Sequence, residues 1–183
     1  MKKLFFLIIL ICSYFKVEGS LRNLLEGDKI VCLDQLERAS KEDLWDAFLE
    51  GQAKLFFESE IKWLTNQTWF QQAKNVLEFG SGNGAYLSQL AERFQDKTFH
   101  GIEKLHSSVI TSNKYYSNEK VLFEHGDAEV FNDQLISSSD IVLFRLTLQH
   151  LGKPLIALNN TWHYLSSQGY VFIIDSCDLA KKT

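Results

Sequence analysis

The sequence predicts an α/β fold with a doubly wound, mainly parallel sheet of about five strands, preceded by N-terminal helices. Two observations support this fold class. From residue 75 onward, short apolar segments alternate with segments of helical periodicity, which is typical of a parallel sheet with crossover helices. A glycine-rich turn directly follows the first apolar segment, where a strand would lead into a helix.

The length and composition fit one compact domain. The chain has 183 residues, of which 45% are hydrophobic and 23% charged, so a folded core is expected. The net charge is −4 and no cluster of Lys and Arg stands out, which argues against a nucleic-acid-binding protein. No cysteine spacing typical of a metal site is present, so no metal is predicted, and we expect Cys32 and Cys177 to be unpaired thiols.

Residues 1–19 have the pattern of a secretory leader. Lys2 and Lys3 precede an apolar run over residues 4–15, which is shorter than the roughly 20 residues that span a bilayer. A basic start before such a run is typical of a signal peptide. We therefore expect a signal peptide or membrane anchor, membrane contact through residues 4–15, and a secreted, periplasmic or membrane-attached protein. The alternatives are an apolar helix packed on the domain and a cytoplasmic location.

The sequence pattern of residues 20–72 predicts a helical N-terminal extension that would serve as a lid. Ser40 and Asp43 have the spacing of a capping box at the start of a helix. Apolar residues then recur at helical spacing from Leu44 to Leu64. We interpret the aromatic residues of this stripe as packing residues rather than as ligand contacts, because amphipathic helices usually bury their apolar face.

Residues 73–183 contain the predicted sheet. The strands are apolar without alternation, which is typical of strands buried on both faces. Pro154 suits the first turn of a helix, where a missing N–H group is tolerated. We expect strands near residues 75–79, 98–103, 121–127, 140–144 and 169–175, and helices near residues 85–94, 107–116, 128–135 and 154–165.

The glycine turn "GSGNGA" does not identify its ligand alone. It satisfies the dinucleotide fingerprint through Gly80, Gly82 and Ala85, and also the simpler pattern G-x-G-x-G. It lacks the Gly-Lys-Ser/Thr of a P-loop, which argues against nucleoside triphosphates. Two other interpretations stay open at this point. The turn could bind no ligand, or the protein could be an NAD(P)-dependent oxidoreductase.

Three carboxylates near strand ends favour an adenosine ligand that carries a positive charge. Glu103 ends the second strand about twenty residues after the turn, where a carboxylate can accept both ribose hydroxyls. Glu78 would repel a pyrophosphate but suits an ammonium or sulfonium group. Asp127 follows the third strand, where it can accept from the adenine amine. Parallel strands bring such residues to one edge of the sheet.

Five segments then resemble the successive motifs of class I S-adenosylmethionine-dependent methyltransferases, over residues 76–175. They are VLEFGSGNGAYL, GIE, HGDAE, DIVLFRLTLQHLGKPLIAL and LSSQGYVFIID, in the order typical of that family. The resemblance implies a Rossmann-like domain, S-adenosylmethionine as the cofactor, and methyl transfer to a small-molecule acceptor or, less expectedly, a protein. It favours a structural role for His150 and indicates no particular catalytic residue.

The resemblance also implies which residues bind the cofactor. The turn would line its methionine portion, the acids would hold its amino group, ribose and adenine, and Arg145 would face the methyl group. The implied residues are Gly80, Ser81, Gly82 and Gly84 in the turn, Glu78 at the amino group, Glu103 at the ribose, Asp127 and Ala128 at the adenine, and also Lys104 and Arg145.

The family sheet normally continues beyond the fifth strand with a helix and an antiparallel strand pair, and this chain ends eight residues after Asp175. We therefore expect a C-terminally short domain whose fifth strand is an exposed edge, where homo-oligomers can form. A non-catalytic binding protein on a degenerate methyltransferase scaffold is the alternative function.

Overall fold

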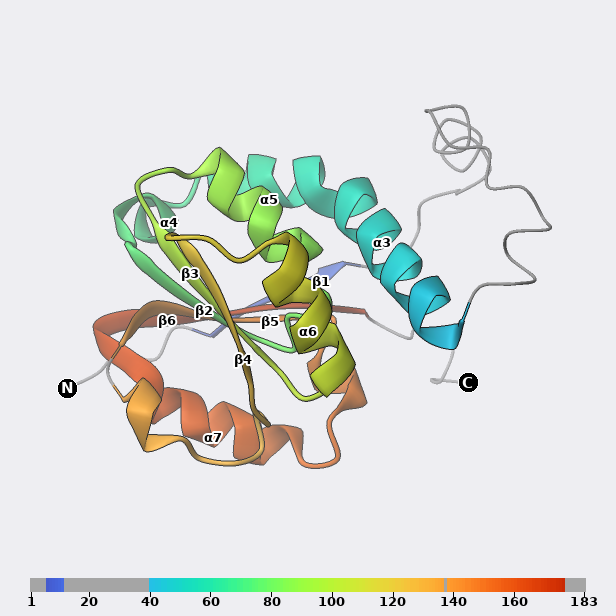
Figure 1. The fold of residues 1–183 in the computed structure, drawn as a ribbon. Coiled ribbons are helices and arrows are strands. Elements are labelled where there is room, and N and C mark those ends of the chain that lie inside the picture. The colour runs from blue at the N-terminus through green and yellow to red at the C-terminus, as the bar shows by residue number, and fades with distance from the viewer. Residues whose placement is uncertain (1–5, 12–39, 137, 177–183) are drawn as a thin grey trace, which may run out of the picture.

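A computed structural model describes residues 6–11, 40–136 and 138–176, so Cys32 and Cys177 lie outside the described residues. The chain forms one parallel sheet with helices on both faces (Figure 1). Helices α3, α5 and α6 cover one face, and α7 covers the other. The predicted α/β class is confirmed.

Within the described residues the sheet has six strands in the order β1-β6-β5-β2-β3-β4, and every pair is parallel. Five of them match the predicted strands. Because β2 lies between β3 and β5, the direction of the crossovers reverses there, and ligands of such sheets bind at this point beyond the carboxyl ends of the strands. The strands are β1 (Phe6–Ile11), β2 (Asn75–Phe79), β3 (Thr98–Glu103), β4 (Val121–His125), β5 (Ser139–Arg145) and β6 (Leu165–Ser176).

The helices begin close to the predicted positions, and Pro154 lies in the first turn of α7. The capping box at Ser40 is present: the Asp43 N–H donates to Ser40 Oγ at 3.1 Å, and the Ser40 N–H donates to Asp43 Oδ2 at 3.1 Å. The helix predicted over residues 128–135 is wrong, because only a short 3-10 turn forms there. The elements are α3 (Lys41–Leu64), α4 (Thr68–Gln72), α5 (Ala85–Arg93), α6 (His106–Tyr115), α7 (Pro154–Tyr164), and the 3-10 turns η1 (Asp133–Leu135) and η2 (Leu148–His150).

The segment that resembled a leader supplies the sixth strand. β1 pairs in parallel with β6 from Phe6 opposite Val171 to Ile11 opposite Ser176. The expectation that the fifth strand is an open edge is therefore wrong, because β6 is covered by β1 in the sheet. A short apolar run is typical of both a leader and a buried parallel strand, so hydrophobic periodicity cannot distinguish the two. The signal peptide stays a prediction, testable by mass spectrometry of the mature N-terminus.

Deletion of residues 1–11 is expected to lower the melting temperature by more than about 3 °C, because β6 loses its outer neighbour. Deletion of residues 1–5 alone is the matched control and should have a smaller effect. Thermal unfolding followed by circular dichroism measures both. Equal melting temperatures for the two deletions would contradict a contribution of β1 to the sheet.

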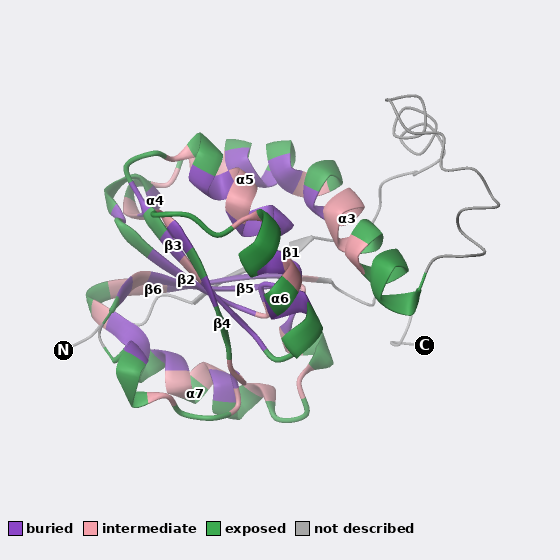
Figure 2. Ribbon diagram, viewed as in Figure 1, coloured by how far each residue is buried: buried purple, intermediate pink, exposed green. Residues whose placement is uncertain are grey.

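Apolar side chains pack on both faces of the sheet, and the central strands are almost wholly buried (Figure 2). On one face, Phe57, Ile61 and Leu64 of α3 join a cluster with α5 and the sheet. On the other face, α7 packs through residues such as Ala157 and Tyr164. Packing thus accounts for the second half of the aromatic stripe of α3. Among the described residues, no helix combines the length and apolar character needed to cross a bilayer.

Candidate functional site

A cavity of about 1050 Å³ lies at the carboxyl ends of β2, β3, β4 and β5, beneath helix α3. Residues of the loops that follow these strands line one side of it, and α3 lines the other. All ten residues that the sequence assigned to a cofactor site lie on the elements around this cavity, and nine of them line it: Glu78, Gly80, Ser81, Gly82, Glu103, Lys104, Asp127, Ala128 and Arg145.

The glycine turn between β2 and α5 has a backbone that only glycine adopts readily. Gly80, Gly82 and Gly84 all have positive φ angles, of 74°, 56° and 86°. A Cβ atom at Gly80 would lie 2.4 Å from Thr147 Oγ1, so this glycine also lets two loops approach closely. Gly84 does not line the cavity. It is the N-cap of α5, and a Cβ there would lie 2.7 Å from the ring of Phe123.

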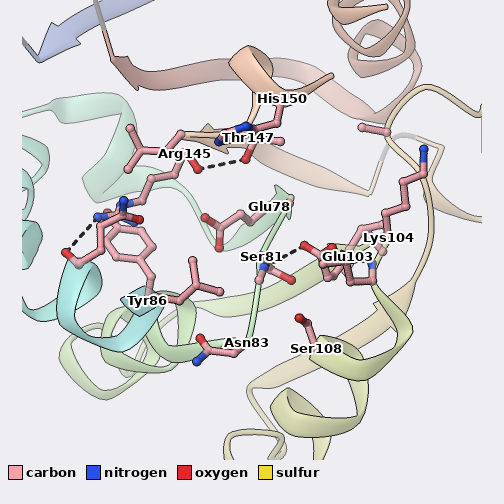
Figure 3. A pocket seen from close by; sticks show the side chains of 18 of the residues that line it. Glu78, Ser81, Asn83, Tyr86, Glu103, Lys104, Ser108, Arg145, Thr147 and His150 are labelled. Atoms are coloured by element: carbon pink, nitrogen blue, oxygen red, sulfur yellow. Dashed lines mark hydrogen bonds between the residues drawn. The ribbon is translucent and has the colours of Figure 1, made fainter. Parts of the chain in front are cut away.

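Glu78 is a buried carboxyl group that faces this cavity (Figure 3). Its side chain is 2% exposed, and its Oε2 atom has no hydrogen-bond partner among the described residues. Burial raises the pKa of Glu78 to about 8, and nearby Arg145 opposes this rise while Glu60 and Glu103 add to it. A buried, unpaired carboxyl group requires an explanation, and a cationic ligand provides one.

Arg145 makes a contact that sequence reasoning missed. Its guanidinium donates from Nε to Glu60 Oε2 of α3 at 3.0 Å, and both side chains are buried. The guanidinium also lies 4.2 Å from the ring centroid of Tyr86. Burial raises the pKa of Tyr86 well above its usual value, with the Glu60 carboxylate as the second cause. Glu60 lies on the apolar side of α3. An acidic residue between Phe57 and Leu64 was the sequence signal that could have indicated a buried ion pair.

Glu103 joins the glycine turn to the loop that follows β3. Its Oε2 accepts the N–H of Gly82 at 3.0 Å, and its Oε1 accepts the N–H of Leu105 at 2.7 Å. The side chain therefore has a structural role in addition to any contact with a ribose. Its position at the end of β3, facing the cavity, agrees with the sequence prediction (Figure 3).

Asp127 and Lys104 form an ion pair across the cavity rim, with 2.7 Å between Oδ2 and Nζ. The hydrogen bond from Lys104 holds the pKa of Asp127 below its usual value. The other oxygen, Oδ1, accepts the N–H of Glu129 at 2.9 Å. Asp127 thus also stabilises its own turn, which is a common use of Asp after a strand. The pairing of these two site residues was not predicted.

The loop after β5 holds the remaining polar groups. The Thr147 hydroxyl lies 2.9 Å from the carbonyl oxygen of Arg145 and 3.1 Å from that of Phe79, so it ties the ends of β5 and β2 together. Leu146 between them has a φ of 53°, an unusual value for a branched residue that often marks a functional site. His150 lines the cavity. No group of three or more His, Cys, Asp or Glu side chains in the described ranges is arranged for a metal ion.

The fold and this site define a Rossmann-like methyltransferase domain of class I. A family model described as a methyltransferase domain matches residues 70–183. The chain therefore belongs to this methyltransferase family, whose cofactor is S-adenosylmethionine. No match was found among curated proteins.

Solved structures agree with this fold. The plantazolicin methyltransferase BpumL, in complex with a monoazolic desmethylPZN analog and SAH, superimposes with a TM-score of 0.58 at 22% identity, over 76% of this chain and 52% of that chain. A SAM-dependent methyltransferase from Aquifex aeolicus gives a TM-score of 0.54 at 19% identity, over 64% and 62%. The chain thus spans roughly half to three fifths of the length of these proteins.

Proposed function

We propose that this chain binds S-adenosylmethionine in the cavity and transfers its methyl group to a small-molecule acceptor. The observation that carries the proposal is Glu78, a buried and unpaired carboxyl group directed into a cavity beside a glycine turn. A positively charged amino-acid end of a ligand favours ionisation of this group and pairs with it, whereas a pyrophosphate opposes that ionisation and offers no cationic partner. The same feature argues against a dinucleotide-dependent oxidoreductase.

The residues present fit this cofactor. Gly80 and Gly82 line the cavity and carry no side chain, so a ligand can approach the backbone of the turn closely. Glu103 stands at the end of β3, where a ribose would be held, and Asp127 follows β4, where it would lie beside an adenine. Ala128 is a small side chain that leaves space for a flat base.

S-Adenosylmethionine supplies a methyl group that its sulfonium charge already activates. The protein then has to align the acceptor with that methyl group and exclude water. The turn and Glu78 would fix the methionine end, and α3 would close the cavity above it. The buried pair of Arg145 and Glu60 joins α3 to the end of β5 and so holds this arrangement.

Isothermal titration calorimetry with S-adenosylmethionine and S-adenosylhomocysteine tests the proposal. We expect saturable binding of both, with one ligand per chain. Absence of binding at about 1 mM ligand, which corresponds to about 4 kcal/mol, would reject the proposed cofactor site. Binding without methylation of any acceptor would favour the non-catalytic alternative.

Cofactor affinity is expected to rise with pH from about pH 6 to about pH 8, because Glu78 must ionise to pair with the amino group. In the free protein the pKa of Glu78 is about 8, so the carboxyl group holds a proton at neutral pH. An ammonium group beside it lowers this pKa, so binding releases a proton and is favoured as the pH rises. Above the free-protein pKa this effect ends.

Titrations in buffers of different ionisation enthalpy measure the released proton directly. A Glu78→Gln variant is the matched control, since it keeps the shape of the side chain but cannot titrate. We expect weaker binding and no proton release from this variant. Equal proton release from both proteins would mean that another group titrates.

A further inference from the structure

The first half of α3 exposes aromatic side chains toward the cavity instead of burying them. Trp45 and Phe48 are 45% and 54% exposed, and both line the cavity. Their rings stack with 5.4 Å between centroids and 23° between planes. The expectation that aromatic residues of this helix are packing residues is therefore wrong for these two. Large apolar groups exposed at a cavity mark a binding surface.

Polar contacts hold this half of α3 in place. Asn83 Nδ2 donates to the carbonyl oxygen of Asp46 at 3.1 Å, and Thr111 Oγ1 donates to Asp46 Oδ2 at 3.3 Å. The Tyr116 hydroxyl donates to Glu50 Oε1 at 3.1 Å. Hydrogen bonds to the turn and to the α6 region thus anchor the helix, and its aromatic pair is left free to contact a ligand.

The cavity has space for a second molecule beside the cofactor. Its volume of about 1050 Å³ is just above the range of about 300 to 1000 Å³ found for small-molecule sites. The polar residues that fit the cofactor lie on the strand ends, whereas α3 contributes a wall that is mostly apolar. The two sides of the cavity therefore suit ligands of different chemistry.

The α3 wall carries no unbalanced charge. Glu60 is the only charged residue that α3 contributes to the cavity, and it is paired with Arg145. The other α3 residues of the wall are Trp45, Phe48, Leu49, Gln52, Leu55, Phe56 and Ser59. A charged acceptor would lose its hydration against this wall, and no α3 side chain of the wall offers it an unpaired opposite charge.

We infer that the acceptor is an uncharged molecule with a flat aromatic body, which stacks on Trp45 and Phe48 of α3 and directs a nucleophilic heteroatom toward the interior of the cavity. This inference depends on the proposed methyl transfer. In that step the heteroatom forms a bond to the methyl carbon while the carbon–sulfur bond breaks. The electron pair of the broken bond stays on sulfur, and the proton of the acceptor passes to water.

Binding of 1-naphthol to the protein saturated with S-adenosylhomocysteine tests the inference by calorimetry. We expect 1-naphthol to bind at least about 5-fold more tightly than decahydro-1-naphthol, which is uncharged but not flat, and than 1-naphthoate, which is flat but charged. Trp45→Ala and Phe48→Ala should each weaken naphthol binding about 5-fold or more, because stacking and buried apolar area are lost. Leu44→Ala, on the same helix but outside the cavity wall, is the matched control.

Equal affinity for the three probes, or naphthol binding that survives both aromatic substitutions, would overturn the inference. Loss of S-adenosylhomocysteine affinity as large as the loss of naphthol affinity would assign the aromatic pair to the cofactor, and would also overturn it. Failure of the unmodified protein to bind S-adenosylhomocysteine would instead reject the proposed function. Retained S-adenosylhomocysteine binding by the variants shows that they are folded.

Discussion

A Glu60→Leu variant is expected to lose about 3 to 5 kcal/mol of its free energy of unfolding, because Arg145 would remain buried without its partner. The two side chains are only 4% and 6% exposed, so water cannot replace the lost carboxylate. The pair also joins α3 to the end of β5, and its loss weakens the attachment of the helix that roofs the cavity. Urea denaturation followed by fluorescence measures the effect.

Removal of both charges tests whether the loss of stability comes from the unpaired charge that Glu60→Leu leaves buried. A Glu60→Leu/Arg145→Met double variant should regain much of the lost stability, since two apolar groups often replace a buried ion pair at little cost. The exposed pair of Lys74 and Asp96, 2.7 Å apart, offers a control, and Lys74→Gln should change stability only slightly. A Glu60→Leu effect as small as that of Lys74→Gln would show that the buried pair does not stabilise the fold.

The strands and the glycine turn could be predicted because their signals are local. Each strand from β2 to β6 contains a short apolar run, and Gly80, Gly82 and Gly84 lie between a strand and a helix. Parallel topology then brings Glu78, Glu103 and the loop at Asp127 to one edge of the sheet. Three acids far apart in the sequence could therefore be assigned to one site.

The pairings could not be predicted, because they depend on side-chain geometry between distant segments. Glu60 and Arg145 are 85 residues apart, and nothing in either segment indicates the other. The contact of Lys104 with Asp127 likewise joins two separate segments and could not be predicted from either one. The strand β1 was not predicted for a different reason. The apolar run of a leader and that of a buried parallel strand have the same composition.

Replacement of Glu103 by alanine is expected to weaken cofactor binding by about 1 to 3 kcal/mol, or roughly 5- to 150-fold, through loss of a charged hydrogen-bond acceptor. This side chain is almost fully buried and faces the cavity at the end of β3. Its oxygens already accept N–H groups of Gly82 and Leu105, so the substitution also removes the link between two cofactor loops. Calorimetry with S-adenosylhomocysteine measures the affinity.

Two further variants distinguish direct contact from loop positioning. Glu103→Gln keeps one carbonyl oxygen that can still accept the N–H of Gly82, but it lacks the second acceptor and the charge that favour two ribose hydroxyls. Weak binding by Glu103→Gln with an unchanged melting temperature would indicate direct contact, whereas near-normal binding would indicate loop positioning. Glu124→Ala, on the neighbouring strand β4 and exposed, is the matched control and should bind normally. Unchanged affinity in Glu103→Ala would mean that the cofactor does not contact this carboxylate and would contradict its assignment to the ribose.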